Sequence, residues 1–322
     1  MKIRISSSCP FNLDLTLCCG QAFRWSKQGE WWYGVVEGKI FKIRQIGEEL
    51  EFENANVDFV KNYFGLNEDL PRILLEISKD EHIKHAVEMF KGLRILRQNP
   101  WECLISYICA TYKNISAIKQ MLFNISKKFG EEISFNGQKF YTFPTPERLA
   151  KATTQELANC GLGYRVKYVS ETAKMAYESR FDFEGLRNMS HEEARKELLG
   201  FPGVGLKVAD CVLLFSLGKF EAFPVDVWIK RVILKYYAEH FQKEFVKKIS
   251  GKRGLSNAEY EELNFFGRKY FGEYAGYAQE YLYHYERTRG QIRFFSFKVS
   301  AALFPLVVVM DIASETSAMT LA

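Results

Sequence analysis

Residues 198–226 constrain the fold of this chain more than any other part of the sequence. They read LLGFPGVGLKVADCVLLFSLGKFEAFPVD. Just before them, residues 190–199 begin with an N-cap serine, continue with acidic residues and repeat apolar residues at helical spacing, so we expect a helix that ends at Gly200. We expect a second helix from about Gly205. The segment therefore predicts two helices joined by a glycine-rich hairpin.

The glycines of this hairpin indicate phosphate binding. Gly200, Gly203 and Gly205 allow positive φ angles, and without a Cβ they let a phosphate approach main-chain N–H groups closely. We therefore expect Gly203 and Gly205 to contact a nucleic-acid backbone. The hairpin carbonyls are also suited to hold a structural monovalent cation.

A lysine and an aspartate follow the hairpin. Lys207 lies in the first turn of the second helix, where exposed N–H groups and the helix dipole disfavour an ammonium ion and favour a nucleophilic amine. Cys211 follows four residues later, on the same helix face. A Phe-Pro-Val sequence leads into Asp226, the expected N-cap of a helix through Trp228. Taken alone, Lys207 would be interpreted as a solvated helix lysine and Asp226 as an N-cap only. Together with the hairpin, the two residues are predicted to be catalytic.

These features resemble the DNA glycosylases of the helix-hairpin-helix superfamily with a Gly/Pro…Asp loop, and in particular the 8-oxoguanine DNA glycosylase family. The resemblance extends over residues 10–290 in the family's order. Its motifs are GQAFRW at 20–25, LRQNPWECLISYIC at 96–109, CGLGYRVKYV at 160–169, the hairpin, and YAGYAQEYLY at 274–283. It implies a bifunctional repair enzyme that excises 8-oxoguanine from duplex DNA and cleaves the strand by β-elimination.

The resemblance also implies chemical roles. Asp226 is expected to stabilise positive charge on the deoxyribose, while Lys207 attacks C1′ and forms a Schiff base. Neither step requires a metal or an organic cofactor. A glycosylase without lyase activity would need only the aspartate, so the lysine is the residue that predicts both activities.

A second set of residues is expected to bind the extruded base. Gly20 resembles the residue whose carbonyl accepts the N7–H of 8-oxoguanine, a hydrogen that guanine lacks. Gln279 offers an amide to the Watson–Crick edge, and Cys211 and Tyr283 would sandwich the ring. Tyr283 stands where a phenylalanine is common in the family, and its ring can still stack.

A third set is expected to hold the DNA. Tyr164 resembles the aromatic wedge that fills the space left by the extruded base, and Arg165 resembles the residue that reads the orphaned cytosine opposite it. Asn114 lies in a loop expected at the same interface. Trp228 stands where a histidine is familiar; indole cannot become cationic, so we expect a weaker phosphate contact there.

Two further departures concern the orphaned base. Animal family members have an asparagine and an arginine near this base, whereas this chain has Tyr112 and Ala117. Fewer hydrogen bonds then depend on the base being cytosine. We therefore expect weaker discrimination between partner bases.

Composition limits the class of protein. The chain has 322 residues and a net charge of +5, so a DNA-binding surface is expected to be a local patch. No cysteine follows Cys211, which excludes the iron–sulfur cluster of the endonuclease III branch, and the five dispersed histidines form no zinc pattern, so we expect no metal. Scattered cysteines and the absence of a signal peptide predict a cytoplasmic or nucleoid protein, nuclear in a eukaryote. We expect a monomer without a membrane span, bound to double-stranded DNA containing 8-oxoguanine.

The pattern along the chain predicts an α+β protein. Residues 31–52 contain short β-prone runs broken by glycines, which indicates an antiparallel meander, and helical spacing dominates from residue 57 to 286. We expect a small antiparallel-sheet N-terminal domain at 1–91, a mainly helical helix-hairpin-helix domain at 92–292 and an unassigned tail at 293–322.

Two other functions fit parts of the pattern. One is a helix-hairpin-helix glycosylase for another damaged base, although the alkylation branch usually needs no residue like Lys207. The other is a non-catalytic DNA-binding module, because similar hairpins hold phosphates in polymerases, ligases and nucleases. A covalent adduct with damaged DNA after borohydride reduction distinguishes both from the first interpretation.

Overall fold

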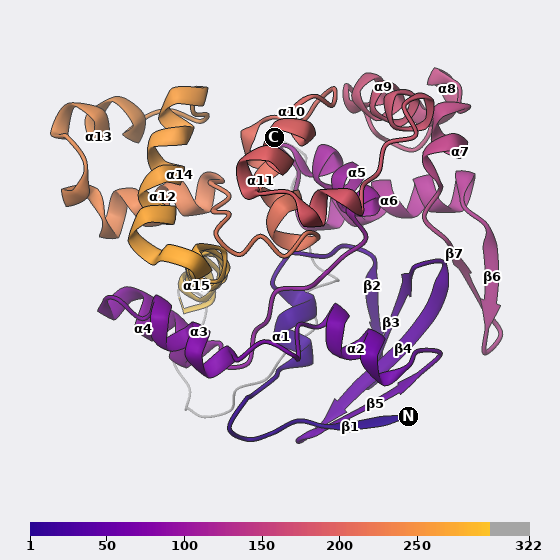
Figure 1. Cartoon of the computed structure of the whole chain (residues 1–322), viewed down its shortest axis with the longest axis horizontal. Coiled ribbons are helices and arrows are strands. Elements are labelled where there is room, and N and C mark those ends of the chain that lie inside the picture. The colour runs from indigo at the N-terminus through magenta and orange to yellow at the C-terminus, as the bar shows by residue number, and fades with distance from the viewer. Residues whose placement is uncertain (297–322) are drawn as a thin grey trace.

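A five-stranded antiparallel sheet and a larger array of helices make up the computed structural model (Figure 1), which describes residues 1–296. The predicted α+β class is confirmed, with the sheet first and the helices after it. The tail expected at 293–322 lies outside the described residues from 297 onward.

The sheet has the strand order β1-β5-β4-β3-β2, and all neighbouring strands are antiparallel. The strands are β1 Lys2–Arg4, β2 Trp25–Gln28, β3 Trp31–Val36, β4 Lys39–Ile46 and β5 Glu49–Glu53. Ile43 pairs with Trp32 on one side and Phe52 on the other, and all three are buried on the same face of the sheet. This confirms the meander predicted for residues 31–52.

Helices dominate the rest of the chain, as the apolar spacing predicted. Their bounds are α1 Leu13–Cys18, α2 Val57–Tyr63, α3 Leu70–Ile77, α4 Glu81–Met89, α5 Pro100–Ala110, α6 Ile115–Phe129, α7 Pro146–Ala150, α8 Thr154–Ala158, α9 Arg165–Glu178, α10 His191–Leu199, α11 Leu206–Phe215, α12 Val227–Tyr236, α13 Lys243–Ser250, α14 Asn257–Phe271 and α15 Ala275–Ser296. A short hairpin that the sequence did not predict, β6 Glu132–Phe135 and β7 Gln138–Tyr141, separates α6 from α7.

Two apolar clusters hold these elements together. The smaller cluster lies between the sheet and α1 and α2, and contains Phe41, Ile43 and Phe64. The larger cluster contains the helical array and also the apolar residues of α3 and α4, which pack against α15. The domain boundary near residue 91 stays a prediction; in this packing, the helices just before it join the later helices.

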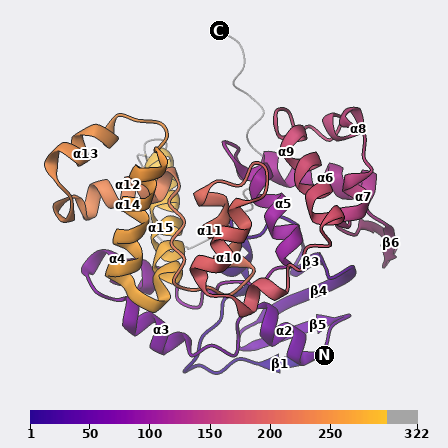
Figure 2. The same ribbon diagram turned by 45° about the horizontal axis from the view of Figure 1, so that its top comes forward.

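The hairpin helices lie centrally in the helical array. Both views place α10 and α11 between α12, α14 and α15 on one side and α5 to α9 on the other (Figures 1 and 2). Helix α11 packs on α5 and α10, while α15 packs on α4, α12 and α14. None of the helices within residues 1–296 combines the length and the hydrophobicity that a membrane span requires.

Candidate active site

The hairpin between α10 and α11 forms as the sequence predicts. Ser190 caps α10 in a capping box with Glu193, and α11 begins directly after Gly205. Of the three hairpin glycines, Gly203 alone adopts a positive φ, of 79°, whereas Gly200 and Gly205 have φ angles of −68° and −95°. The left-handed backbone expected at all three therefore occurs at one.

The two glycines proposed to hold phosphate differ in their surroundings. A Cβ at Gly203 would lie 2.6 Å from the Cβ of Tyr168, so both its φ and its packing require glycine. Gly205 is exposed, and a Cβ there would meet nothing within 4 Å. Its backbone is therefore open to a large ligand such as a phosphate.

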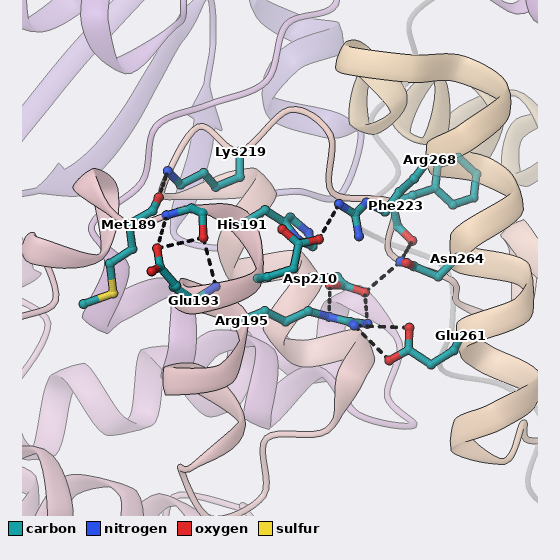
Figure 3. Close-up of polar contacts among 12 residues, drawn as sticks. Met189, His191, Glu193, Arg195, Asp210, Lys219, Phe223, Glu261, Asn264 and Arg268 are labelled. Atoms are coloured by element: carbon teal, nitrogen blue, oxygen red, sulfur yellow. Dashed lines mark hydrogen bonds and ion pairs between the residues drawn. The ribbon is translucent and has the colours of Figure 1, made fainter.

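A buried ionic network fixes α11 against its neighbours (Figure 3). Asp210 is fully buried, and Arg195 on α10 donates to both of its oxygens at 2.8 and 3.1 Å. Tyr260 and Asn264 on α14 donate to the same carboxylate at 2.6 and 2.9 Å. Burial raises the pKa of Asp210, and Arg195 and Tyr260 oppose that rise. Sequence reasoning missed this network; its one signal was an acid inside the apolar run VADCVLLF.

Lys207 lies on α11 one residue after Leu206, the first residue of that helix. Its side chain is half-buried, and Nζ lies 5.8 Å from the centre of the Tyr107 ring. Lys207 also lies close enough to Cys211 and Asp226 to lower the pKa of both groups. The lysine, cysteine and aspartate predicted from the sequence are therefore neighbours in the structure.

Asp226 forms the predicted N-cap of α12. Its Oδ1 accepts hydrogen bonds from the backbone N–H groups of Trp228 and Ile229 at 2.9 and 2.8 Å. Burial raises the pKa of this carboxyl, while Lys207 and the two N–H groups oppose that rise. The cap leaves Oδ2 available to interact with positive charge near Lys207.

Cys211 and Tyr283 come from α11 and α15. Burial raises the pKa of Cys211 to about 12, so its thiol is protonated at neutral pH and offers an uncharged, polarisable surface. Burial also raises the pKa of the half-buried Tyr283, and Asp226 contributes to the increase. Both groups therefore share surroundings with the proposed catalytic pair.

Gly20 reaches the same place from the end of α1. Its φ of 110° is one that side chains rarely adopt. A Cβ there would lie 3.4 Å from Tyr283 Oη and 3.0 Å from Arg287 Nη1. The structure thus brings Gly20 next to Tyr283, as expected, and adds Arg287, which donates to the carbonyl of Cys18 at 2.9 Å.

Gln279 is buried, and its Oε1 has no hydrogen-bond partner within the described part of the chain. Buried acceptors without partners are rare in folded proteins. The neighbouring Glu280 shows the same feature at its own Oε1. Sequence reasoning named Gln279 and missed Glu280, because nothing in the spacing of YAGYAQEYLY separates a buried acid from a surface one.

The proposed wedge is exposed and its neighbour is not. Tyr164 is 58% exposed at the start of α9, with Oη 3.4 Å from the carbonyl oxygen of Thr111, so it is not a core tyrosine. Arg165 is 2% exposed and donates to the carbonyls of Thr111 and Leu162. The expectation that Arg165 reads a base therefore requires its guanidinium to leave these carbonyls.

The remaining residues expected at the DNA surface lie in different settings. Asn114 is exposed, but its side chain already caps α6 by accepting the N–H of Ala117 at 2.8 Å. Tyr112 is 81% exposed with a φ of 55°, which is unusual for a bulky residue. Trp228 is half-buried, with the guanidinium of Arg231 4.7 Å from its ring centre.

Within residues 1–296, no group of three or more histidine, cysteine, aspartate or glutamate side chains is arranged to hold a metal ion. The seven cysteines of the sequence all lie in this part of the chain and are free thiols. The site is thus built from an amine, carboxyl groups, a thiol, an amide and backbone groups.

Comparisons with known proteins agree with this arrangement. Residues 2–104 match the model of the 8-oxoguanine DNA glycosylase N-terminal domain, and residues 105–252 match the HhH-GPD superfamily of base excision DNA repair proteins. The chain is 31% identical to the N-glycosylase/DNA lyase of Saccharomyces cerevisiae, in an alignment that covers 88% of this chain and 84% of the yeast protein.

Two more relatives extend the comparison. The chain is 32% identical to a probable N-glycosylase/DNA lyase of Methanothermobacter thermautotrophicus, over 66% of this chain and 69% of that protein. The structure superposes with a TM-score of 0.78, at 34% identity, on the Clostridium acetobutylicum 8-oxoguanine glycosylase/lyase bound to double-stranded DNA with cytosine opposite 8-oxoguanine, covering 87% of this chain and 93% of that one. The two family models, the sequence identities and the superposition all point to the same family. The chain therefore belongs to the 8-oxoguanine DNA glycosylase family of the HhH-GPD superfamily.

Proposed function

We propose that this protein is a DNA repair glycosylase that excises 8-oxoguanine from duplex DNA and cleaves the strand at the resulting site. The observation that carries the proposal is the position of Lys207, in the first turn of α11 and beside Asp226 at the N-cap of α12. The yeast and Methanothermobacter relatives are named N-glycosylase/DNA lyases, and the clostridial complex contains 8-oxoguanine opposite cytosine.

The first chemical step breaks the C1′–N9 bond, and its electron pair moves to the departing base. Positive charge that develops on the deoxyribose is stabilised by Asp226, which burial places in a medium of low dielectric constant. Nζ of Lys207 forms the new bond to C1′ and loses a proton. Opening of the sugar ring then leaves a Schiff base between C1′ and the lysine.

The second step is the strand cleavage. The Schiff base withdraws electrons from C2′ and makes its proton acidic. When a base removes this proton, a C2′–C3′ double bond forms and the bond from C3′ to the phosphate oxygen breaks. This β-elimination needs no metal and no organic cofactor, so we propose that the protein works without one. A monovalent cation on the hairpin carbonyls remains part of this proposal, in a structural role.

The base itself is proposed to lie between Cys211 and Tyr283, with Gln279 at its Watson–Crick edge. The unpartnered Oε1 of Gln279 supports this placement, because a guanine-type base presents N–H donors on that edge. Gly20, at a φ of 110°, supplies a backbone that a side chain would obstruct. Exposed Tyr164 is proposed to fill the space that the extruded base leaves in the stack.

We further propose that the protein acts as a monomer in a reducing compartment, the cytoplasm or nucleoid, or the nucleus in a eukaryote. The free state of its seven cysteines supports a reducing compartment. Sedimentation with and without a duplex tests the monomer.

Borohydride trapping tests the function directly. The protein is incubated with duplexes that contain 8-oxoguanine, guanine or an alkylated purine at one position, and the Schiff base is reduced. We expect a covalent adduct with the 8-oxoguanine duplex alone. An adduct on another damaged base would indicate a different glycosylase, and binding without any adduct would indicate a non-catalytic DNA-binding module.

A further inference from the structure

Two consecutive residues on α15 bury acceptor atoms that have no partner. Gln279 is 4% exposed and Glu280 is 2% exposed, and Oε1 of each lacks a hydrogen-bond partner among the described side chains and backbone. Leaving a buried polar atom unpaired is unfavourable, so such atoms indicate a ligand that pairs with them. Gln279 is accounted for by the proposed base site, whereas Glu280 is not.

Glu280 lies among residues from several walls of this site. Its charge raises the pKa of Tyr107 on α5, Cys211 on α11 and Tyr283 on α15, so the carboxyl lies within electrostatic range of all three. Cys19, at the end of α1, also lies within electrostatic range of the carboxyl, while its thiol donates to the carbonyl oxygen of Thr16 at 3.3 Å. Because Cys19 directly precedes Gly20, Glu280 approaches the site from the Gly20 side.

The two unpartnered acceptors lie in different directions around α15. Consecutive helical residues are separated by about 100° around the helix axis, so Gln279 and Glu280 address different edges of a planar ligand. Guanine has N–H donors on its Watson–Crick edge alone, and N7 on the opposite edge is an acceptor. 8-Oxoguanine has a donor on both edges, because its N7 carries hydrogen. The pair of acceptors therefore matches the lesion and not the normal base.

We propose that Glu280 is a specificity-determining residue whose carboxylate accepts the N7–H of 8-oxoguanine beside Gly20. This inference rests on the proposed function and adds a charged acceptor to the expected backbone carbonyl. A carboxylate attracts N7–H through a charge-assisted hydrogen bond and repels the N7 lone pair of guanine. The same residue therefore favours the lesion and disfavours the normal base.

The surroundings of Glu280 make this selectivity depend on pH. Burial, with a smaller contribution from Asp226, raises the pKa of Glu280 to about 7 against the opposing effects of Cys19 and Arg287. Two neighbouring groups titrate far from neutrality, because burial raises the pKa of Cys211 to about 12 and lowers that of His284 to about 3, whereas burial also raises the pKa of Asp226. Below about pH 7 the protonated acid becomes a donor, which suits the N7 of guanine.

The test measures binding selectivity for the N7 hydrogen. Three duplexes differ at one position opposite cytosine: 8-oxoguanine, guanine, and 8-methoxyguanine, which keeps the C8 oxygen but has no N7–H. Affinities are measured with Lys207→Gln as the parent, so that no base is excised during the titration. In this background, Glu280→Gln is compared with Glu286→Gln, a change on the same helix at a residue paired with Lys235 at 3.3 Å.

We expect Glu280→Gln to reduce the ratio of 8-oxoguanine to 8-methoxyguanine affinity by about tenfold, the effect of losing one charge-assisted hydrogen bond. Glu286→Gln should leave the ratio unchanged. A merely structural role for Glu280 would weaken binding to all three duplexes alike. An unchanged ratio in Glu280→Gln overturns the inference. A parent that does not prefer 8-oxoguanine over guanine overturns the proposed function instead.

A second measurement needs no substitution at residue 280. In the parent protein, the ratio of 8-oxoguanine to 8-methoxyguanine affinity is followed from pH 5.5 to 8.5, a range of about one and a half units on either side of neutrality. We expect the ratio to rise with a midpoint near pH 7, where Glu280 ionises. A ratio independent of pH would overturn the inference even if every variant at residue 280 failed to fold.

Discussion

Asp210 on α11 and Glu280 on α15 are both buried acids of the helical array, but their surroundings are opposite in kind. Asp210 receives hydrogen bonds from Arg195 and Asn264 (Figure 3) and from Tyr260, and it links three helices. Glu280 has an oxygen without a partner, and burial raises its pKa to about 7. The folded protein supplies hydrogen-bond partners for Asp210, whereas Glu280 keeps an oxygen that a ligand can bind.

Helix α11 has two faces with different roles. Asp210 faces the network that fixes the helix, while Lys207 and Cys211, three residues before it and one after it, lie near Asp226 on the side of the site. A rigid helix whose other face carries the reactive groups keeps the nucleophile in position. Substitutions on the two sides should therefore affect different properties, stability on one and chemistry on the other.

The largest expected effect is on the reactive face. Lys207→Gln removes the amine proposed to attack C1′, so the borohydride adduct and strand cleavage should both disappear. Binding to the duplex should change little, because the hairpin glycines and not Lys207 are proposed to hold the phosphates. The adduct is quantified by gel after reduction, and binding by fluorescence anisotropy. An adduct of normal yield in this variant shows that another residue is the nucleophile.

On the opposite face, Asp210→Asn breaks a buried ion pair and weakens the bonds to Tyr260 and Asn264. We expect a loss of about 3 kcal/mol in the free energy of unfolding, because removing one member of a buried pair leaves the other uncompensated. Urea denaturation measures the loss. Well below the melting temperature the variant should still form the borohydride adduct, and a folded but inactive variant would contradict the separation of the two faces.

Glu280→Gln should stabilise the protein without DNA, in contrast to Asp210→Asn. The folded pKa of Glu280, about 7, exceeds the usual value of 4.5, so ionisation destabilises the fold as pH rises through this window. Below pH 4.5 the penalty is absent, and above pH 7 it reaches about 3 kcal/mol at most. Unfolding free energies at pH 5 and pH 8 should therefore show a gain for the variant mainly at pH 8; an equal effect at both would mean that Glu280 is not ionised by pH 8.

Gln279→Ala removes the other unpartnered acceptor. It leaves the Watson–Crick edge of the bound base unpaired in a dry site, which costs about 1–3 kcal/mol. Single-turnover excision of 8-oxoguanine should slow by roughly ten- to a hundredfold, since 1.4 kcal/mol corresponds to about tenfold. Unchanged excision would place Gln279 outside the base site.

The smallest expected effect concerns the orphaned base. Tyr112 and Ala117 offer few hydrogen bonds that require cytosine, and Arg165 is engaged by backbone carbonyls. Excision opposite cytosine should therefore exceed excision opposite adenine by a smaller factor than in family members with the asparagine and arginine. Single-turnover rates on four duplexes that differ in the opposite base give the factor, and near-exclusive use of cytosine would show that another residue reads it.

Local chemistry made part of this molecule predictable from its sequence. The N-caps at Asp226 and Ser190 and the end of α10 at Gly200 depend on residues a few positions apart, and each forms as predicted. The meander at residues 31–52 follows in the same way from alternation and glycine turns. In these segments the neighbours in sequence are also the neighbours in space.

The rest depended on packing between distant segments. Glu280 and Gln279 look alike in the sequence, and only the approach of α1 and α5 makes Glu280 a buried acid without a partner. Asp210 is recognisable as a structural acid only once α10 and α14 are in place. Arg165 was expected at the DNA surface, but the carbonyls of Thr111 and Leu162 draw its guanidinium inward.

The contact between Gly203 and Tyr168 couples two parts of the molecule. Gly203 sits where a side chain would strike Tyr168, and the Tyr168 ring lies edge-on to Tyr164, with 6.3 Å between centres. The hairpin that would hold the backbone therefore touches the same helix, α9, that carries the wedge. With the proposed roles, this contact fixes the distance between the phosphate held by the hairpin and the base step entered by Tyr164, so the two should lie a set number of nucleotides apart.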